Sequence, residues 1–204
     1  MTQRRQTKTN LKIKEAFTYL MNKKGLEAMS VSDLTRQAKI NRSTFYHHYT
    51  DKYDLKDHLE QEAINDLKRL LLDDSDNSHE NRLFPYPCIL NALNYVKEDL
   101  PFFLAMTLHN DSRFSDRFKE VLKEMIAMQV SRDNQLNYHT PDIPEDYATE
   151  IMLGSVNAII LLWLRKGGID TPNAIATLIS QAKYLSPYQM IGQGDPDESD
   201  LIPV

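Results

Sequence analysis

Apolar residues recur at helical spacing along nearly the whole of this 204-residue chain. In the first such pattern, Leu11, Ala16, Phe17, Leu20 and Met21 fall on one side of a helix with 3.6 residues per turn. No stretch alternates between apolar and polar residues for long, and the chain has only 6 glycines. Because strands need a period of two, the pattern predicts an all-α protein.

We expect about nine helices. The predicted spans are residues 10–22, 30–38, 42–49, 51–72, 89–98, 101–109, 114–136, 145–166 and 174–185. Polar residues 73–84 and the proline-containing segment 138–144 are predicted loops. We therefore expect a small helical domain over residues 1–56, a larger one over residues 57–185, and a flexible acidic tail over residues 186–204.

The charge of the chain is unevenly distributed. Residues 1–56 contain twelve lysines and arginines and five acidic residues, a net charge of +7, so the remainder carries −12 of the total of −5. A basic head on an acidic body indicates an anionic partner for the head. The alternative is a solvated, lysine-rich face without a partner.

Several classes of protein are not expected from the sequence. One cysteine, Cys88, allows no internal disulfide and fits a reducing cytoplasm. The basic N-terminus has no apolar segment behind it, so no secretory signal is expected. Residues 151–164 form the longest charge-free apolar stretch, which is short for a membrane span and favours a buried helix. No metal site or cofactor is expected, because His47 and His48 are adjacent and point about 100° apart on a helix.

Residues 30–49 predict a helix-turn-helix unit. Ser30 and Asp33 have the spacing of a capping box, the second helix begins after Asn41, and Phe45 is expected to anchor that helix to the core. In such a unit the N-terminal part of the second helix meets DNA base edges in the major groove. An arginine can fork onto guanine, while hydroxyl and ring side chains can pack on sugars and bond phosphates. The alternative is that these rings only fill core or surface. The residues expected to face DNA are Arg42, Ser43, Thr44, Tyr46, His47 and His48.

Two further residues are expected at phosphates. Lys52 lies in the first turn of the next helix, where the helix dipole disfavours a cation but attracts an anion. Ser32 lies at the start of the preceding helix and can make a similar contact.

Residues 32–55, SDLTRQAKINRSTFYHHYTDKYDL, resemble the DNA-binding head of TetR-family transcriptional regulators. The resemblance covers about residues 8–60 and implies base contacts by Arg42, Ser43 and His47. It implies phosphate contacts by Thr44, Tyr46, His48 and Lys52. The family usually has glycine in the turn where this chain has Lys39; a left-handed lysine there would cost about 1 kcal/mol, and another turn is the alternative. Residues 154–171 also resemble a subgroup of these regulators that includes a dihydroxyacetone-kinase operon activator.

The resemblance implies an all-α body that binds a ligand and forms a dimer. Residues 145–166 are apolar nearly all round, and residues 174–185 carry a similar stripe, so a second apolar face requires a partner. Two helices from each of two chains would form a four-helix interface. The alternative is that both helices are central in a monomer.

An unknown small-molecule effector is expected in the body. Its predicted contacts are apolar side chains, with plain core packing as the alternative reading of each: Phe103, Met106, Phe118, Met125 and Trp163, from a wider set that includes Phe102, Phe114 and Met128.

The predicted function is that of a cytoplasmic, homodimeric, ligand-responsive repressor that binds double-stranded DNA at a two-fold operator. The alternative is a helix-turn-helix interaction protein that acts as a co-regulator or activator through another regulator. An enzyme is not expected, because no nucleophile–base pair or phosphate-binding glycine loop is present.

Overall fold

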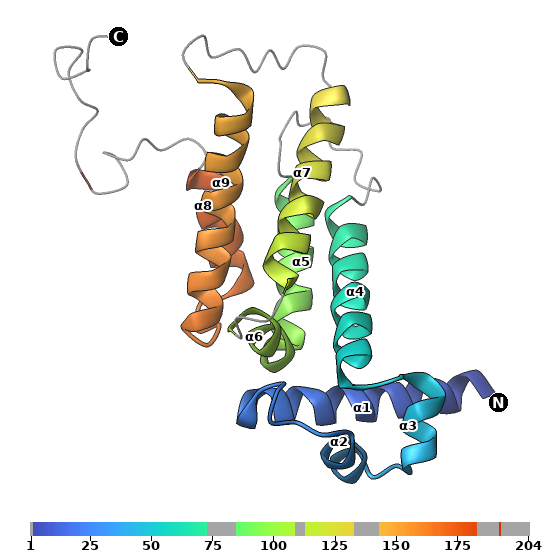
Figure 1. Ribbon diagram of the computed structural model, residues 1–204. Helices are drawn as coiled ribbons and strands as arrows, with labels where there is room; N and C mark the ends of the chain where they lie inside the picture. Colours follow the sequence, from blue (N-terminus) through green and yellow to red (C-terminus); the bar gives the residue numbers. More distant parts are fainter. Residues whose placement is uncertain (1, 73–84, 109–112, 133–142, 183–191, 193–204) are drawn as a thin grey trace, which may run out of the picture.

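The computed structural model describes residues 2–72, 85–108, 113–132, 143–182 and 192, and within these ranges it is entirely helical. The predicted fold class is confirmed. Nine helices lie in the described ranges (Figure 1): α1 Thr2–Lys24, α2 Val31–Ala38, α3 Arg42–His48, α4 Lys52–Leu71, α5 Tyr86–Glu98, α6 Leu100–Leu108, α7 Phe114–Arg132, α8 Glu145–Arg165 and α9 Pro172–Ala182.

The head is built from α1, α2, α3 and the first turns of α4. Figure 1 shows α1 lying across the lower end of α4, with α2 and α3 beneath it. Phe17, Met21, Leu34, Phe45 and Leu55 are at most 1% exposed and form its core. Each of the four helices thus contributes at least one apolar side chain to the core of the head, because no single short helix can bury its own apolar face.

Helix α4 continues from the head into the body without a break. Leu55, Leu59, Ala63, Leu67 and Leu71 are buried along its whole length. Its start is capped by Asp51, whose carboxylate accepts hydrogen bonds from the N–H groups of Tyr53 and Asp54 at 2.8 Å each. The predicted boundary between residues 56 and 57 therefore falls inside a helix.

The body consists of α5 to α9 packed with the rest of α4. Helix α5 lies between α4 and α9, and α7 lies between α4 and α8. Short α6 joins the head to the body by packing on both α1 and α8. After the end of α8, Gly168 has a φ of 61°, a left-handed conformation that favours glycine, and a Cβ there would also lie 2.9 Å from the end of the Leu100 side chain.

Helix ends differ from the predictions by a few residues. Helix α1 begins at Thr2 instead of residue 10, and α5 begins at Tyr86 because Pro87 suits a first-turn position. The predicted loop over residues 73–84 lies outside the described residues, as do most of the segment 138–144 and all of the tail except Gly192.

Helix α8 is less buried than predicted. Residues 146–165 are long and apolar enough to cross a membrane by length and composition alone, and they are the one such helix among the described residues. Only 22% of that apolar window is buried. Trp163 and Leu153 face the core, whereas Ile151 and Leu162 are 66% and 52% exposed. In the single chain the predicted buried helix is therefore buried on one side, and its exposed apolar side is the second face for which the sequence predicts a partner.

Candidate DNA-binding surface and body cavity

Local hydrogen bonds fix the start of α2 and tie it to the end of α1. The Ser30 hydroxyl accepts from the Asp33 N–H at 3.1 Å, and the Asp33 carboxylate accepts from the Ser30 N–H at 3.1 Å, so the predicted capping box is present. The Asp33 carboxylate also accepts from Lys24 at 2.7 Å. This bond, with those from Ser30, holds the pKa of Asp33 well below its usual range.

Lys39 takes the left-handed conformation, with φ 54° and ψ 50°. It is the one non-glycine residue with positive φ in the described ranges. The N–H groups of Lys39 and Ile40 bond the carbonyls of Arg36 and Thr35, which closes the turn after α2. This chain therefore keeps a glycine-type turn with a lysine in it, and the alternative of a different turn is excluded.

Helix α3 has one buried side and one solvent-exposed side. Phe45 is fully buried, which confirms its predicted role, and Thr44 and His48 beside it are half-buried. The exposed residues of the helix are Arg42, Ser43, Tyr46 and His47, and we call these four the α3 face. At about 100° per residue they span an arc of roughly 140° on one side of the helix.

The α3 face is cationic and rich in hydrogen-bonding groups. Arg42 has no ion pair with another described residue, and the half-exposed Tyr46 ring packs edge-on against Phe45 at 5.6 Å between centroids. Tyr49 ends the helix and is buried, which raises the pKa of its phenol. The base-contact candidates Arg42, Ser43 and His47 thus lie together on the surface, while Thr44 and His48 reach it only in part.

The two other phosphate candidates differ in their surroundings. Ser32 is exposed in the first turn of α2. Lys52 is half-buried, and its ammonium donates to the carbonyls of Leu26 at 2.9 Å and Glu27 at 3.0 Å. Lys52 therefore ties the start of α4 to the loop after α1, a structural role that the sequence did not reveal. Its contact with a phosphate remains a prediction.

Two polar contacts join the head directly to the body. Lys14 on α1 pairs with Asp99 at 2.6 Å, and its ammonium lies 4.2 Å from the centroid of the Phe102 ring. Nearby, the Asn22 amide donates to the carbonyl of Pro101 at 2.9 Å. Both contacts bridge α1 to the α5–α6 corner, so the orientation of the head depends on the position of α6.

A buried ion cluster, defined here as Lys56, Glu60 and Arg117, joins α4 to α7. Lys56 Nζ lies 3.0 Å from Glu60 Oε1, and the two side chains are 7% and 0% exposed. Arg117 Nη1 lies 3.5 Å from Glu60 Oε2, and its Nη2 lies 3.8 Å from Asp57 Oδ1. Helical periodicity did not predict this cluster. The pattern identifies buried positions by their apolar residues, so it gives no sign that a charged residue such as Glu60 is buried.

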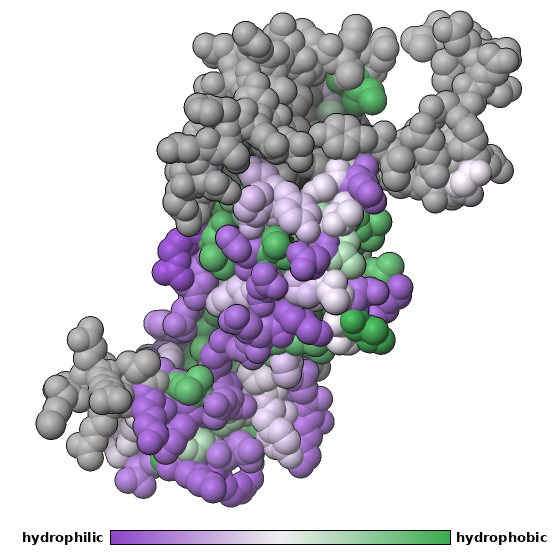
Figure 2. Space-filling model, turned by 180° about the vertical axis from the view of Figure 1, so that it is seen from behind, coloured by the Kyte–Doolittle hydropathy of each residue, from purple (hydrophilic) through white to green (hydrophobic). Residues whose placement is uncertain are grey.

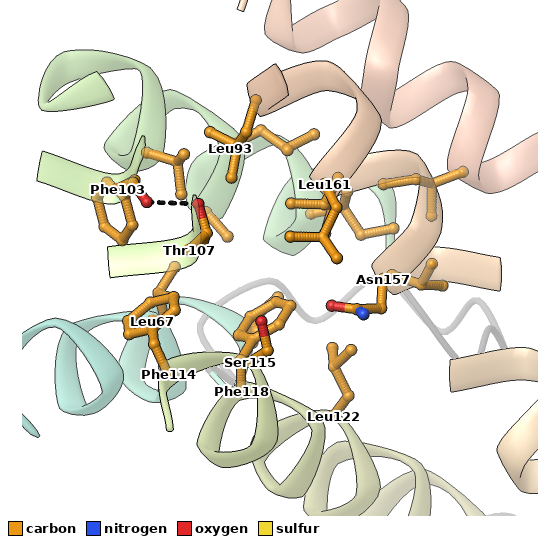
Figure 3. Close-up of a pocket in the computed structure, with 18 residues that line it drawn as sticks. Leu67, Leu93, Phe103, Thr107, Phe114, Ser115, Phe118, Leu122, Asn157 and Leu161 are labelled. Atoms are coloured by element: carbon orange, nitrogen blue, oxygen red, sulfur yellow. Dashed lines mark hydrogen bonds between the residues drawn. The ribbon is translucent and has the colours of Figure 1, made fainter. Parts of the chain in front are cut away.

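The body contains a cavity of about 50 Å³ between α4, α5, α6, α7, α8 and α9. Fifteen of its eighteen lining residues are apolar, and the other three are Thr107, Ser115 and Asn157. In Figure 3 these polar side chains lie among rings and aliphatic groups from several helices. The sequence analysis did not identify any of the three polar residues.

The predicted effector contacts divide into two groups. Phe103 and Phe118 line the cavity, as does Phe114. Met106, Met125 and Trp163 are at most 1% exposed but do not line it. Trp163 instead packs at the end of α8, where its indole N–H donates to the carbonyl of Asp170 at 3.0 Å. Contact of these three residues with an effector stays a prediction, because helical periodicity shows which side chains are buried but not which of them border a void.

Comparison with known families gives one match in the head and its junction with the body and a second match in the body. Residues 15–59 match the family described as bacterial regulatory proteins, tetR family, and residues 85–182 match a transcriptional regulator C-terminal region of the same group. Relatives include the uncharacterized HTH-type transcriptional regulator YxbF of Bacillus subtilis, 25% identical over 92% of this chain and 48% of that protein. The chain thus spans about half the length of YxbF. The dhaKLM operon transcriptional activator DhaS of Lactococcus lactis is 25% identical over 83% of each chain.

Solved structures show the same fold. The fatty acid degradation regulator FadR from Bacillus halodurans superposes with a TM-score of 0.66 at 14% identity, covering 85% of this chain and 93% of that one. The structure of the dihydroxyacetone kinase operon activator DhaS gives a TM-score of 0.58 at 23% identity with the same coverage. With a helix-turn-helix head, an all-helical body and family matches over both, the chain belongs to the TetR family of DNA-binding transcriptional regulators, which are not enzymes.

Proposed function

We propose that the chain is a homodimeric, ligand-responsive repressor that acts in the cytoplasm on a two-fold operator. The observation that carries the proposal is the α3 face, which presents an exposed guanidinium, a hydroxyl, a phenol and an imidazole on one side of an anchored helix. Such groups form hydrogen bonds to base edges and to phosphate oxygens when a helix lies in a major groove. Buried Phe45 fixes the helix, so the face is rigid before DNA arrives.

The DNA-binding part is tested by fluorescence anisotropy of the purified protein. The duplex comes from the region upstream of its own gene, with a scrambled duplex as reference, across a salt series. Arg42→Ala is expected to weaken specific binding by about 1–3 kcal/mol and to relax the preference at one base pair. Arg69→Ala, at an exposed arginine in the body part of α4, is the matched control. Unchanged selectivity of Arg42→Ala in a base-substitution series would reject a base-reading role.

The dimer part rests on the uncovered apolar side of α8 and α9. Ile151 and Leu162 are exposed on α8, with small Ser155 and Ala158 between them at helical spacing, and Leu178 on α9 is 46% exposed. Seen from behind, hydrophobic groups gather along the right-hand edge of the body, on the side of α8 and α9, while the head below is mostly hydrophilic (Figure 2). A second copy covering this face would place two α3 helices on one operator, whose half-sites lie about 34–36 Å apart.

Sedimentation measurements test the dimer. Leu162→Glu puts a charge on this face without touching the core and is expected to give monomers that lose cooperative operator binding. Leu11→Glu, at an exposed leucine on α1, is the control and should remain dimeric. A wild-type monomer, or a Leu162→Glu dimer, would contradict the proposal.

The effector part rests on the cavity and its link to the head. A ligand between α6 and α7 would move helices that hold α1 through Lys14 and Asn22 and hold α4 through the ion cluster. The two heads would then change their separation and lose the match to the operator. If the affinity for the operator were the same with and without a ligand bound in the cavity, this part of the proposal would be rejected.

Activation is the second candidate function, because one relative, DhaS, is named as a transcriptional activator. In that case the chain acts as a co-regulator through another regulator. The anisotropy experiment separates the two: specific duplex binding by the pure protein supports a self-sufficient repressor, and absence of binding until a second regulator is added supports the co-regulator.

A further inference from the structure

The lining of the cavity in the body is mostly apolar and carries no charge among the described residues. It consists of fifteen apolar and three uncharged polar residues. Its volume of about 50 Å³ is several times the roughly 10–15 Å³ that one water requires. Because a cavity that holds a benzene ring measures about 150 Å³, a short organic molecule whose surface is mostly hydrocarbon enters only if the surrounding helices move apart, which is the movement that the proposed effector response requires.

The arginine of α7 that is close in sequence to the cavity residue Ser115 is already paired with carboxylates of α4. Arg117, two residues from Ser115, points to α4, where its guanidinium lies within 3.8 Å of both Glu60 and Asp57. A carboxylate or ammonium group in the cavity would find no opposite charge among the described lining residues. Since burial of an unpaired ion is far more costly than burial of a neutral polar group, the lining selects against charged ligands.

The three polar side chains offer unequal hydrogen bonds. The Thr107 hydroxyl donates to the Phe103 carbonyl at 2.7 Å, so its hydrogen is used within its own helix. Figure 3 shows the Asn157 amide of α8 and the Ser115 hydroxyl of α7 pointing toward each other across the cavity. Neither is hydrogen-bonded to another described residue in that view. This pair is the place in the lining where a ligand can both donate and accept.

We infer that the cavity binds a small, uncharged, largely apolar molecule with one hydrogen-bonding group, such as an alcohol or amide, and that this group meets Asn157 and Ser115. The inference rests on the proposed effector response and adds the chemical class of the effector. An apolar body fills the space between the phenylalanine rings and the leucines, and one polar group satisfies the amide and the hydroxyl.

A matched series of six-carbon probes tests the charge preference. 1-Hexanol, hexanamide, hexanoate and hexylammonium share one chain and differ in the end group, and the last two are ionised at about pH 7. Binding to the full chain is measured by saturation-transfer NMR titration. The neutral probes are expected to bind at least about tenfold more tightly than either ion. Equal or tighter binding of an ion, or no binding of any probe, would overturn the inference.

Two variants locate the polar contact. Asn157→Leu and Ser115→Ala are each expected to weaken hexanamide about tenfold while leaving toluene, an apolar probe, unaffected. Asn94→Leu, at an exposed asparagine on α5, is the control and should change neither probe. If one cavity variant fails to fold by circular dichroism, the other still decides the question. Unchanged hexanamide affinity in a folded variant would show that the polar group does not bind there.

Operator anisotropy in the presence of hexanamide separates this inference from the proposed function. If hexanamide binds with the expected preference but leaves duplex affinity unchanged, the effector response fails and the ligand class stands. If the duplex is bound but the ions are preferred in the cavity, the ligand class fails and DNA binding stands.

Discussion

Loss of the Glu60 carboxylate should destabilise this protein more than loss of a surface carboxylate between the same two helices. Glu60 lies on α4, just beyond the head, and its side chain is fully buried. One oxygen pairs with Lys56 at 3.0 Å, and the other lies 3.5 Å from Arg117, which is long for a hydrogen bond. The substitution Glu60→Gln keeps the shape of the side chain and removes only the charge.

The expected magnitude follows from what the substitution leaves behind. Lys56 is 7% exposed, and breaking a buried ion pair of this kind by removing one charge costs about 3–5 kcal/mol. For a chain of this length that corresponds to a decrease in Tm of about 6–20 °C. Arg117 is 29% exposed and still faces Asp57, so we expect it to contribute little to the loss.

A double-mutant cycle isolates the pair. Because removal of both buried charges avoids an unpaired ion, Lys56→Met combined with Glu60→Gln should cost at least about 2 kcal/mol less than the sum of the single substitutions. Glu124→Gln is the matched control, since the Lys68–Glu124 pair also joins α4 to α7 but its side chains are 43% and 51% exposed. That substitution should cost no more than about 1 kcal/mol.

The assay is chemical denaturation of the full chain, followed by circular dichroism, with thermal melts in parallel. If Glu60→Gln lost no more stability than Glu124→Gln, the buried ion pair of Glu60 with Lys56 would contribute no more to stability than a surface pair. Additivity of the two single substitutions would reject the coupling between Lys56 and Glu60.

Three further results are expected. Lys39→Gly should gain roughly 0.5–1 kcal/mol in denaturation, because relief of a left-handed lysine outweighs the flexibility of glycine in the unfolded chain; a loss of stability would contradict the turn geometry. Lys52→Ala should lose about 1.5–3 kcal/mol of stability, because its ammonium would no longer donate to two carbonyls. If Lys52 also contacts a phosphate, the salt slope of duplex binding should fall by about one in this variant, and an unchanged slope would reject that contact. The lowered pKa of Asp33 contributes stability that is complete above the unfolded pKa of about 4 and is lost as pH falls further, so Asp33→Asn should flatten the acid limb of a pH series of melts; identical limbs for both proteins would refute this.

The sequence alone was sufficient for the fold class and for the head. A period of 3.6 residues predicted helices over most of their lengths, and the capping box at Ser30 and Asp33 predicted where α2 starts. These are local properties, because a cap and an apolar stripe depend on residues within a few positions of one another. The α3 face was predictable for the same reason: one short helix, anchored by Phe45, determines which of its neighbours are exposed.

The tertiary structure decided what depends on residues far apart in the chain. Lys52 reaches carbonyls about 25 positions earlier, and Glu60 meets Arg117 from another helix, so neither contact has a local signal. The cavity is the clearest case: six helices border it, and Phe118 lines it while the equally apolar Trp163 does not. Periodicity shows that a side chain is buried, but a void exists only where several packed helices fail to fill the space between them, and that is a property of the assembled body.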